Sequence, residues 1–288
     1  MAQQKVANTA TFCILYYLIR GGIVIKVVFI GDIVGSVGRK AVKEMLPIIK
    51  KKWSPDFIIA NGENAAAGRG ITKQIAKDLF EQGIHGITMG NHTWDNKDIF
   101  DFIDEESRMV RPANFPEGTP GRGAAVLKSE GKELAIINLQ GRTFLPPLDC
   151  PFAKAEVLVK QITKKTKHIL VDFHAEATSE KIAMGWHLDG KVSAVVGTHT
   201  HVQSHDERIL PLGTAYITDV GMVGPRDGIL GMERSAVLQK FRTQLPVRFN
   251  VDEGKWHFHA VFIELHPQSG LSQRIELIRS YEDQFIME

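Results

Sequence analysis

Nearly continuous apolar runs mark the strands that we expect in the first half of the chain. A strand with apolar residues on both sides is typical of a sheet that is covered on both faces. Each run is short, and each is followed by glycine or by polar residues. The three runs are residues 25–30, 57–60 and 87–89.

Between these runs, apolar residues recur at the three- and four-residue spacing of amphipathic helices. We expect helices at residues 39–52, 72–82 and 95–103. Thr72 is a suitable N-cap for the second helix, and Asp95 or Asn96 for the third. Strands that alternate with helices in this way predict parallel strands with helices on the faces of the sheet.

The second half of the chain combines buried strands with strands that have one exposed face. A hairpin is expected around Glu130-Gly131, helices at residues 153–163 and 179–184, and further buried strands at residues 169–173 and 192–196. Three later segments alternate between apolar and polar positions, which favours antiparallel strands with one exposed face. They are residues 215–218, 255–265 and 272–279. The sequence therefore predicts an α/β fold with mixed sheets.

Composition narrows the classes of protein to which the chain can belong. A chain of 288 residues with 43% hydrophobic and 24% charged residues is typical of a globular protein. The net charge of +2 lacks the basic excess of a DNA-binding protein. The two cysteines, Cys13 and Cys150, are too few for a disulfide framework, which favours the cytoplasm.

Residues 1–24 precede the regular pattern, and we expect them to be an extension outside a single domain that spans residues 25–288. The apolar stretch at residues 11–19 is too short to cross a bilayer. Its flanks lack both the basic cluster and the small-residue cleavage site of a signal peptide. No membrane association is therefore expected.

Polar side chains follow five of the expected strands, at the point where each strand ends. Ligands of open α/β sheets bind beyond the carboxyl ends of the strands, so we expect these side chains to converge on one rim. Oxygen and imidazole donors without a thiolate suit first-row metals such as Fe, Mn, Ni or Zn. The set is too large for one ion and suits two ions bridged by a carboxylate. Its members are Asp32, Glu63, Asn64, Asn91, His92, His174, His199 and His201.

Each of these signals is weak alone, and their recurrence at five strand ends is what makes a metal site the better interpretation. His257 and His259 have the same spacing as His199 and His201 but follow no such strand, so we assign them to a half-exposed strand. Trp94 has two open interpretations, because it could stack on a nucleobase or pack behind His92.

Combined motifs of the chain resemble those of the bacterial YmdB family of calcineurin-like metallophosphoesterases. The resemblance covers the chain from about Ile25 to the C-terminus. The matching segments are FIGDIVG (29–35), NGENAA (61–66), GNHTWD (90–95), RPANF (111–115), DFHAEATSEK (172–181), GTHTHV (197–202) and TDVGM (218–222).

The resemblance implies a four-layer αββα sandwich of two mixed sheets and two bound metal ions, with iron first among the candidates. It implies that Asp32, Glu63, Asn64 and His201 hold one ion. Glu63 would bridge to a second ion, whose other ligands would be Asn91, His174 and His199. His92 would remain free as a general acid.

The activity implied is hydrolysis of phosphodiesters, with 2′,3′-cyclic nucleotides as the expected substrates. The alternative is a regulatory protein that binds a nucleotide or RNA at the same rim with little turnover. A retained His92 favours the enzyme, because binding alone needs no general acid. The sequence leaves the physiological substrate, the metal in the cell and homo-oligomer formation open.

Overall fold

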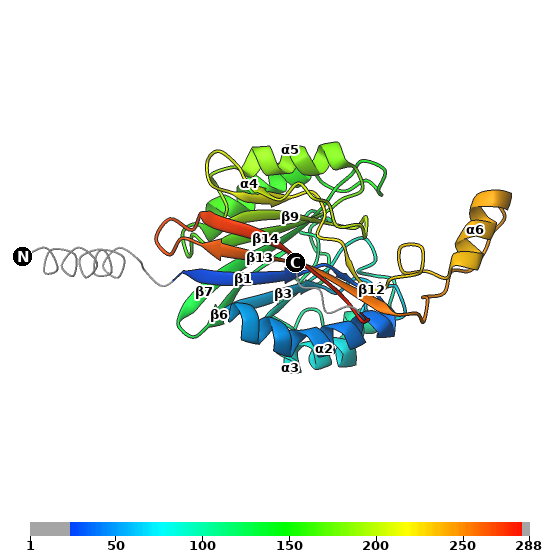
Figure 1. Cartoon of the computed structure of the whole chain (residues 1–288). Helices are drawn as coiled ribbons and strands as arrows, with labels where there is room; N and C mark the ends of the chain where they lie inside the picture. The colour runs from blue at the N-terminus through cyan, green and yellow to red at the C-terminus, as the bar shows by residue number, and fades with distance from the viewer. Residues whose placement is uncertain (1–23, 284–288) are drawn as a thin grey trace, which may run out of the picture.

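Two mixed β-sheets form the centre of the computed structural model, which describes residues 24–283 (Figure 1). In the first sheet, β1, β3, β4 and β5 run parallel, and β13 pairs antiparallel with β1. The strands of this sheet are β1 (Ile25–Ile30), β2 (Asp32–Ile33), β3 (Phe57–Asn61), β4 (Gly86–Thr88), β5 (Met109–Val110), β12 (Met222–Pro225), β13 (Trp256–Leu265) and β14 (Ser272–Tyr281).

The second sheet has the order β10-β11-β9-β8-β7-β6, with its two antiparallel pairs at the edges. The expected hairpin is confirmed: β6 and β7 pair antiparallel around Glu130 and Gly131, which both have positive φ. Two successive residues with positive φ form a type I′ turn, whose twist matches the right-handed twist of the two flanking strands. The strands are β6 (Ala124–Ser129), β7 (Lys132–Gln140), β8 (Ile169–His174), β9 (Ala194–Thr198), β10 (Arg208–Ile209) and β11 (Ala215–Ile217).

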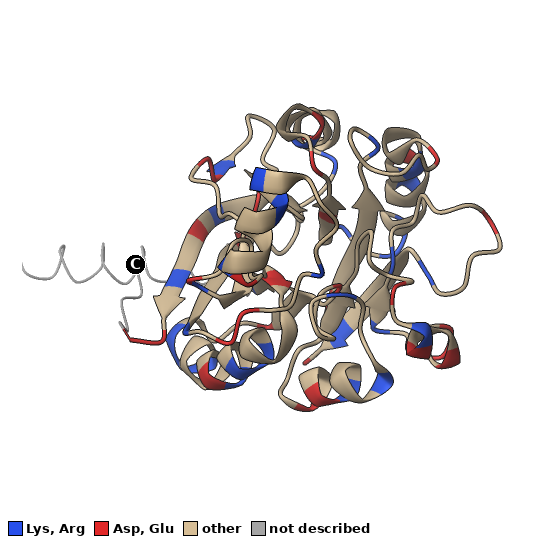
Figure 2. Ribbon diagram, turned by 90° about the vertical axis from the view of Figure 1, so that its right-hand side faces the viewer, with Lys and Arg blue, Asp and Glu red and all other residues tan. Residues whose placement is uncertain are grey.

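Helices cover the outer face of each sheet. α2 (Gly35–Trp53) and α3 (Lys73–Glu81) lie against the first sheet, and α4 (Pro151–Ile162) and α5 (Thr178–Leu188) against the second (Figure 1). Thr72 caps α3 as expected, because its side chain accepts a hydrogen bond from the backbone N–H of Ile75 at 3.2 Å. The ribbon also shows lysine and arginine interspersed with acidic residues on the helices (Figure 2).

Three separate hydrophobic cores follow from the two-residue period of the strands. Along β1, Val28 and Ile30 face the core beneath α2, whereas Val27 and Phe29 face the core between the sheets. A third core, which includes Phe173 of β8, lies between the second sheet and its helices. Strands buried on both faces explain why the apolar runs are nearly continuous.

Two expectations about single elements are wrong. The third expected helix is a short 3-10 helix, η1 (Lys97–Asp101), capped by Asn96, whose side chain accepts from the N–H of Asp98. β13 is not half exposed, because it lies between β1 and β14 in the middle of the first sheet and is buried along most of its length. His259 on this strand is accordingly buried.

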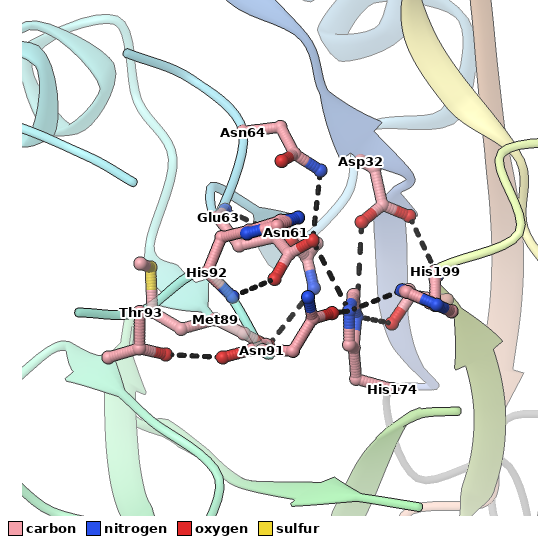
Figure 3. A network of polar contacts seen from close by, with 12 residues as sticks. Asp32, Asn61, Glu63, Asn64, Met89, Asn91, His92, Thr93, His174 and His199 are labelled. Carbon is pink, nitrogen blue, oxygen red and sulfur yellow. Dashed lines mark hydrogen bonds and ion pairs between the residues drawn. The ribbon is translucent and has the colours of Figure 1, made fainter. Parts of the chain in front are cut away.

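The polar strand ends come from two different sheets. β1, β3 and β4 belong to the first sheet, whereas β8 and β9 belong to the second. The sequence did not separate the sheets, because period and apolarity are the same in both. The residues that follow these strands nevertheless meet at the candidate site (Figure 3).

Sequence reasoning missed α6 (Arg234–Thr243), whose only buried residue is Val237. This helix stands apart from both sheets (Figure 1). The expected extension lies almost wholly outside the described residues, which begin at residue 24. Among the helices within residues 24–283, none has the length and apolarity needed to cross a membrane.

Candidate metal centre

Three buried or half-buried side chains form the centre of the site. One ligand atom each from Glu63, His174 and His199 lie within 4.8 Å of one another (Figure 3). His174 Nε2 is 3.2 Å from Glu63 Oε1 and 3.1 Å from His199 Nδ1. Asn91 Oδ1 is 2.9 Å from the same nitrogen of His174. Donors from both sheets therefore surround one point.

The remaining predicted ligands, Asp32, Asn64 and His201, also lie next to this cluster. Asn64 Nδ2 is 2.9 Å from Glu63 Oε1 and 3.2 Å from His201 Nε2. Asp32 Oδ2 accepts a hydrogen bond from the backbone N–H of His199 at 3.2 Å. To bind a metal through oxygen, the Asn64 amide must turn over, because its nitrogen faces Glu63 and His201.

The donor set fits a metal ion in two further respects. Asp32 Oδ1 is buried and has no hydrogen-bond partner among residues 24–283, although buried carboxylate oxygens are normally satisfied. Gly90 lines the same space, and a Cβ at this position would clash with Glu63 Oε2 and His174 Nε2. The site thus combines an unsatisfied oxygen with a cradle that only glycine leaves open. Oxygen and imidazole donors are those that first-row transition metals bind.

The buried groups of the centre perturb one another strongly. Burial alone would lower the pKa of His174, but the charge and hydrogen bond of Glu63 outweigh it and raise this pKa to about 9. Burial would raise the pKa of Glu63, yet His174 holds it below its ordinary value. Burial raises the pKa of Asp32 and lowers that of His199 to about 3. Perturbed titratable groups of this kind cluster at functional sites.

A hydrogen-bonded chain orients the ring of His174. Thr198 Oγ1 donates to Asp172 Oδ1 at 2.7 Å and lies 2.8 Å from His174 Nδ1. Because the hydroxyl has one hydrogen, it accepts from Nδ1–H, and Nε2 faces the centre. Asn61 Nδ2 also donates to Asp172 at 3.1 Å. Partners that fix a ligand's ring in this way are typical of metal sites.

His92 lies beside the centre without joining the cluster of donors. Its backbone N–H donates to Glu63 Oε2 at 3.0 Å, which brings the residue to the edge of the site. Its ring Nδ1 is 2.9 Å from Asp95 Oδ2. Nε2 is therefore the ring nitrogen left for another partner.

Sequence reasoning missed the side chains that support this arrangement. Asp95 was expected as one of two helix caps, but it contacts the ring of His92 instead. Glu176 Oε2 lies 3.0 Å from His199 Nε2. For Asp172 a signal was present, because it lies two residues before His174 and so on the same face of β8. Trp94 packs, stacking on Phe100 with ring centroids 5.3 Å apart.

A cavity of about 470 Å³ opens beside the centre. Its floor is polar and includes Glu63, Asn64, His199 and His201, and the cavity is also lined by Arg69, His92, Glu176, Thr200 and Lys240. Its wall is apolar and comes from α6 and the segments that flank it. The wall consists of Ile229, Leu230, Met232, Val237, Phe241 and Phe249. The size lies within the ~300–1,000 Å³ range of small-molecule sites.

Comparison with known proteins decides the family. The model of the family described as YmdB-like protein matches residues 28–278. The chain belongs to the YmdB-like family. Within it, the chain is 59% identical to a protein of Bacillus subtilis (strain 168) named 2′,3′-cyclic-nucleotide 2′-phosphodiesterase. That match covers 91% of this chain and 100% of the relative.

Two solved structures share the fold of the chain. A hypothetical protein from Thermus thermophilus is 41% identical, with a TM-score of 0.84 over 90% of this chain and 100% of that chain. A more distant likeness is a Staphylococcus aureus protein described as a putative 5′-nucleotidase, with 13% identity and a TM-score of 0.59. It covers 92% of this chain and 56% of that chain, and at this identity it shows the fold alone.

Proposed function

We propose that this YmdB-like protein is a metal-dependent phosphodiesterase that hydrolyses 2′,3′-cyclic nucleotides. The observation that carries the proposal is the convergence of donors from both sheets on Glu63, with the ring of His92 beside them and outside the cluster. A binding protein needs the donors but not a free imidazole at hydrogen-bonding reach of a substrate. The substrate class follows the name of the B. subtilis relative.

Two ions would share the site. We assign Asp32, Glu63, Asn64 and His201 to one, and Asn91, His174 and His199 to the other, with Glu63 between them. Iron is the first candidate, and Mn, Ni and Zn are alternatives for this donor set. When bound, the ions would neutralise phosphate charge and lower the pKa of a water molecule.

The chain's own residues would then do the following. The polar floor binds the cyclic phosphate and orients it. His92, with Nδ1 held by Asp95, donates a proton from Nε2 to the ribose oxygen as the bond from phosphorus to that oxygen breaks. A water molecule supplies the hydroxyl that the phosphorus gains, the proton that this water releases restores the protonated form of His92, and the product is a nucleoside monophosphate. General acid catalysis of this kind contributes roughly 10²–10⁴-fold in rate.

The apolar wall supports a nucleotide as the substrate. Phe241 and Phe249 offer aromatic surface beside the metal centre. Stacking of a base on an aromatic ring stabilises binding by about 1–3 kcal/mol and tolerates any base. We therefore expect little discrimination between adenine, guanine, cytosine and uracil.

Two broader assignments complete the proposal. The three hydrophobic cores, each between two layers, support the four-layer αββα sandwich of calcineurin-like enzymes. The low cysteine content supports a cytoplasmic location.

A substrate panel tests the proposal. Purified protein loaded with Mn²⁺ is assayed with 2′,3′-cyclic nucleotides, bis-aryl phosphodiesters and aryl phosphomonoesters. We expect the diesters to have the higher kcat/KM, and the four cyclic nucleotides to differ from one another by less than about tenfold. Faster monoester turnover would overturn the substrate class. Tight nucleotide binding without turnover would indicate the regulatory protein instead.

A further inference from the structure

A buried ion pair lies beneath the candidate metal centre and belongs to neither proposed ligand set. Lys181 of α5 and Asp219, which follows β11, are both about 1% exposed. Lys181 Nζ is 2.6 Å from Asp219 Oδ2. Removing two charges from water is unfavourable, so a buried pair requires an account of what it does.

The carboxylate of Asp219 is bonded to the segment that carries two proposed ligands. Its Oδ2 accepts from the backbone N–H of Thr200 at 3.0 Å and from Thr200 Oγ1 at 2.7 Å. Thr200 lies between His199 and His201. The same carboxylate accepts the N–H of Gly221 through Oδ1 at 2.8 Å. Asp219 therefore binds the backbone and the side chain of the residue that separates the two histidines.

The backbone on both sides of Thr200 is strained. His199 has φ of 101° and His201 has φ of 64°. Residues with a Cβ rarely adopt positive φ, and they persist there only where surrounding contacts hold them. The conformation turns both rings into the site, where His199 approaches His174 and His201 approaches Asn64. The contacts that hold Thr200 are thus contacts that hold the ligands.

Two motif segments gain a role from this arrangement. Lys181 ends the segment 172–181, and Asp219 lies in the segment 218–222. Neither residue lines the cavity, and sequence reasoning gave neither a function. The ion pair links α5 to the loop after β11, and this link gives both charged residues a structural role.

We propose that Lys181 and Asp219 form a positioning pair that holds Thr200 and so fixes His199 and His201 for metal binding. The proposal rests on the metal centre assigned above. Lys181 neutralises and orients the carboxylate, and the carboxylate holds the strained segment. Neither residue binds the metal or the substrate. A pair that only stabilised the fold would leave the affinity for metal unchanged in a folded variant.

The variant that separates these roles is Thr200→Val. It keeps the shape of the side chain and the buried pair but removes the hydroxyl that donates to Asp219. The control is Thr218→Val, which removes a hydroxyl that donates to Asp206 and leaves both hydrogen bonds between Thr200 and Asp219 in place. Mn²⁺ titrations of metal-free protein followed by electron paramagnetic resonance, together with thermal unfolding of the metal-free proteins, are measured for both variants and for the wild type.

We expect Thr200→Val to bind Mn²⁺ about 10- to 100-fold more weakly, as other losses of a ligand's supporting contacts do. Its metal-free unfolding temperature should be no lower than that of the Thr218→Val control, since Thr200→Val loses one hydroxyl hydrogen bond and the control loses two, with Asp206 and with Tyr216. Equal Mn²⁺ affinity in both variants would overturn the positioning role. Failure of the wild type to bind Mn²⁺ would overturn the metal centre and this inference together, so the two failures are distinguishable.

Asp219→Asn provides a second variant. It keeps the size of the side chain but leaves Lys181 without a charged partner. If the protein folds, Mn²⁺ affinity should fall at least as far as in Thr200→Val, and Asp219→Asn/Lys181→Met should not restore it, because the charged acceptor for Thr200 is absent. Recovery of wild-type affinity in the double variant would contradict the proposal.

Discussion

The floor and the wall of the cavity are opposite in their physical character. Glu63 and Asn64 of the floor are buried and hydrogen-bonded, whereas Phe241 of the wall is 71% exposed and Phe249 is 40% exposed. Donors for a metal must be held at fixed positions, and this requires partners behind them. An apolar surface acts through contact area and needs no such support. Changes in the floor should therefore affect metal content and kcat, and changes in the wall should affect KM.

The largest effect is expected at Glu63, where both halves of the floor meet. Glu63→Ala removes the carboxylate that both ions would share. Metal content should fall by more than one equivalent, and kcat/KM by at least about 10³-fold, since the charge stabilisation lost amounts to several kcal/mol. Elemental analysis and a cyclic nucleotide assay measure the two quantities. Wild-type metal content in this variant would remove Glu63 from the bridging position.

A change at His92 should separate chemistry from metal binding within the same region. His92→Ala should keep both metals and lower kcat about 10²–10⁴-fold on cyclic nucleotides, because a ribose oxygen leaves poorly without a proton. Bis-aryl diesters, whose leaving groups are activated, should lose less. Steady-state rates on both substrates are compared with the metal content of the same preparation. Equal losses on both substrates would rule out the acid role.

Substitutions in the apolar wall should change KM and leave kcat unaltered. Base stacking stabilises binding by about 1–3 kcal/mol, and the partial exposure of Phe241 should reduce this contribution. Phe241→Ala should therefore raise KM for cyclic nucleotides about 5- to 50-fold. The control is Leu238→Ala on the same helix, which is 52% exposed and does not line the cavity. Methyl riboside 2′,3′-cyclic phosphate, which has no base, should be unaffected. A fall in kcat with unchanged KM would assign Phe241 to the floor's role.

The smallest effect is expected from deletion of residues 1–24, to which we assign no site residue. The truncated protein should keep its activity and its unfolding temperature to within the error of the measurements. Both are compared with the full chain under identical metal loading. Loss of metal or of solubility would show that the extension contributes to the domain.

The sequence predicted the floor better than the wall, for a physical reason. Each floor residue follows a short buried strand, and strand ends are recognisable from apolar runs and glycines. Which sheet each strand joins depends on pairing between distant segments, so the sequence did not show that Glu63 and His174 come from different sheets. The wall is built from α6 and the segments that flank it, and α6 has a weak apolar pattern that buries only Val237.

The supporting side chains were the least predictable part of the site. Asp219 bonds Thr200 from 19 residues away, and Asp172 bonds Asn61 from 111 residues away. No local pattern marks such a pair, because the contact exists only after both sheets have packed. Asp95 lay close enough to His92 to be noticed, but the same residue type also caps helices, and this interpretation came first.

Stepwise metal reconstitution tests the central claim most directly. Metal-stripped protein receives Mn²⁺ in increments from zero to three equivalents, and hydrolysis of 2′,3′-cyclic AMP is measured at each step. Because Glu63 joins two sets of donors, activity should remain low through the first equivalent and rise to its full value with the second. Full activity at one equivalent, or no hydrolysis at any loading, would contradict a phosphodiesterase that works with two ions.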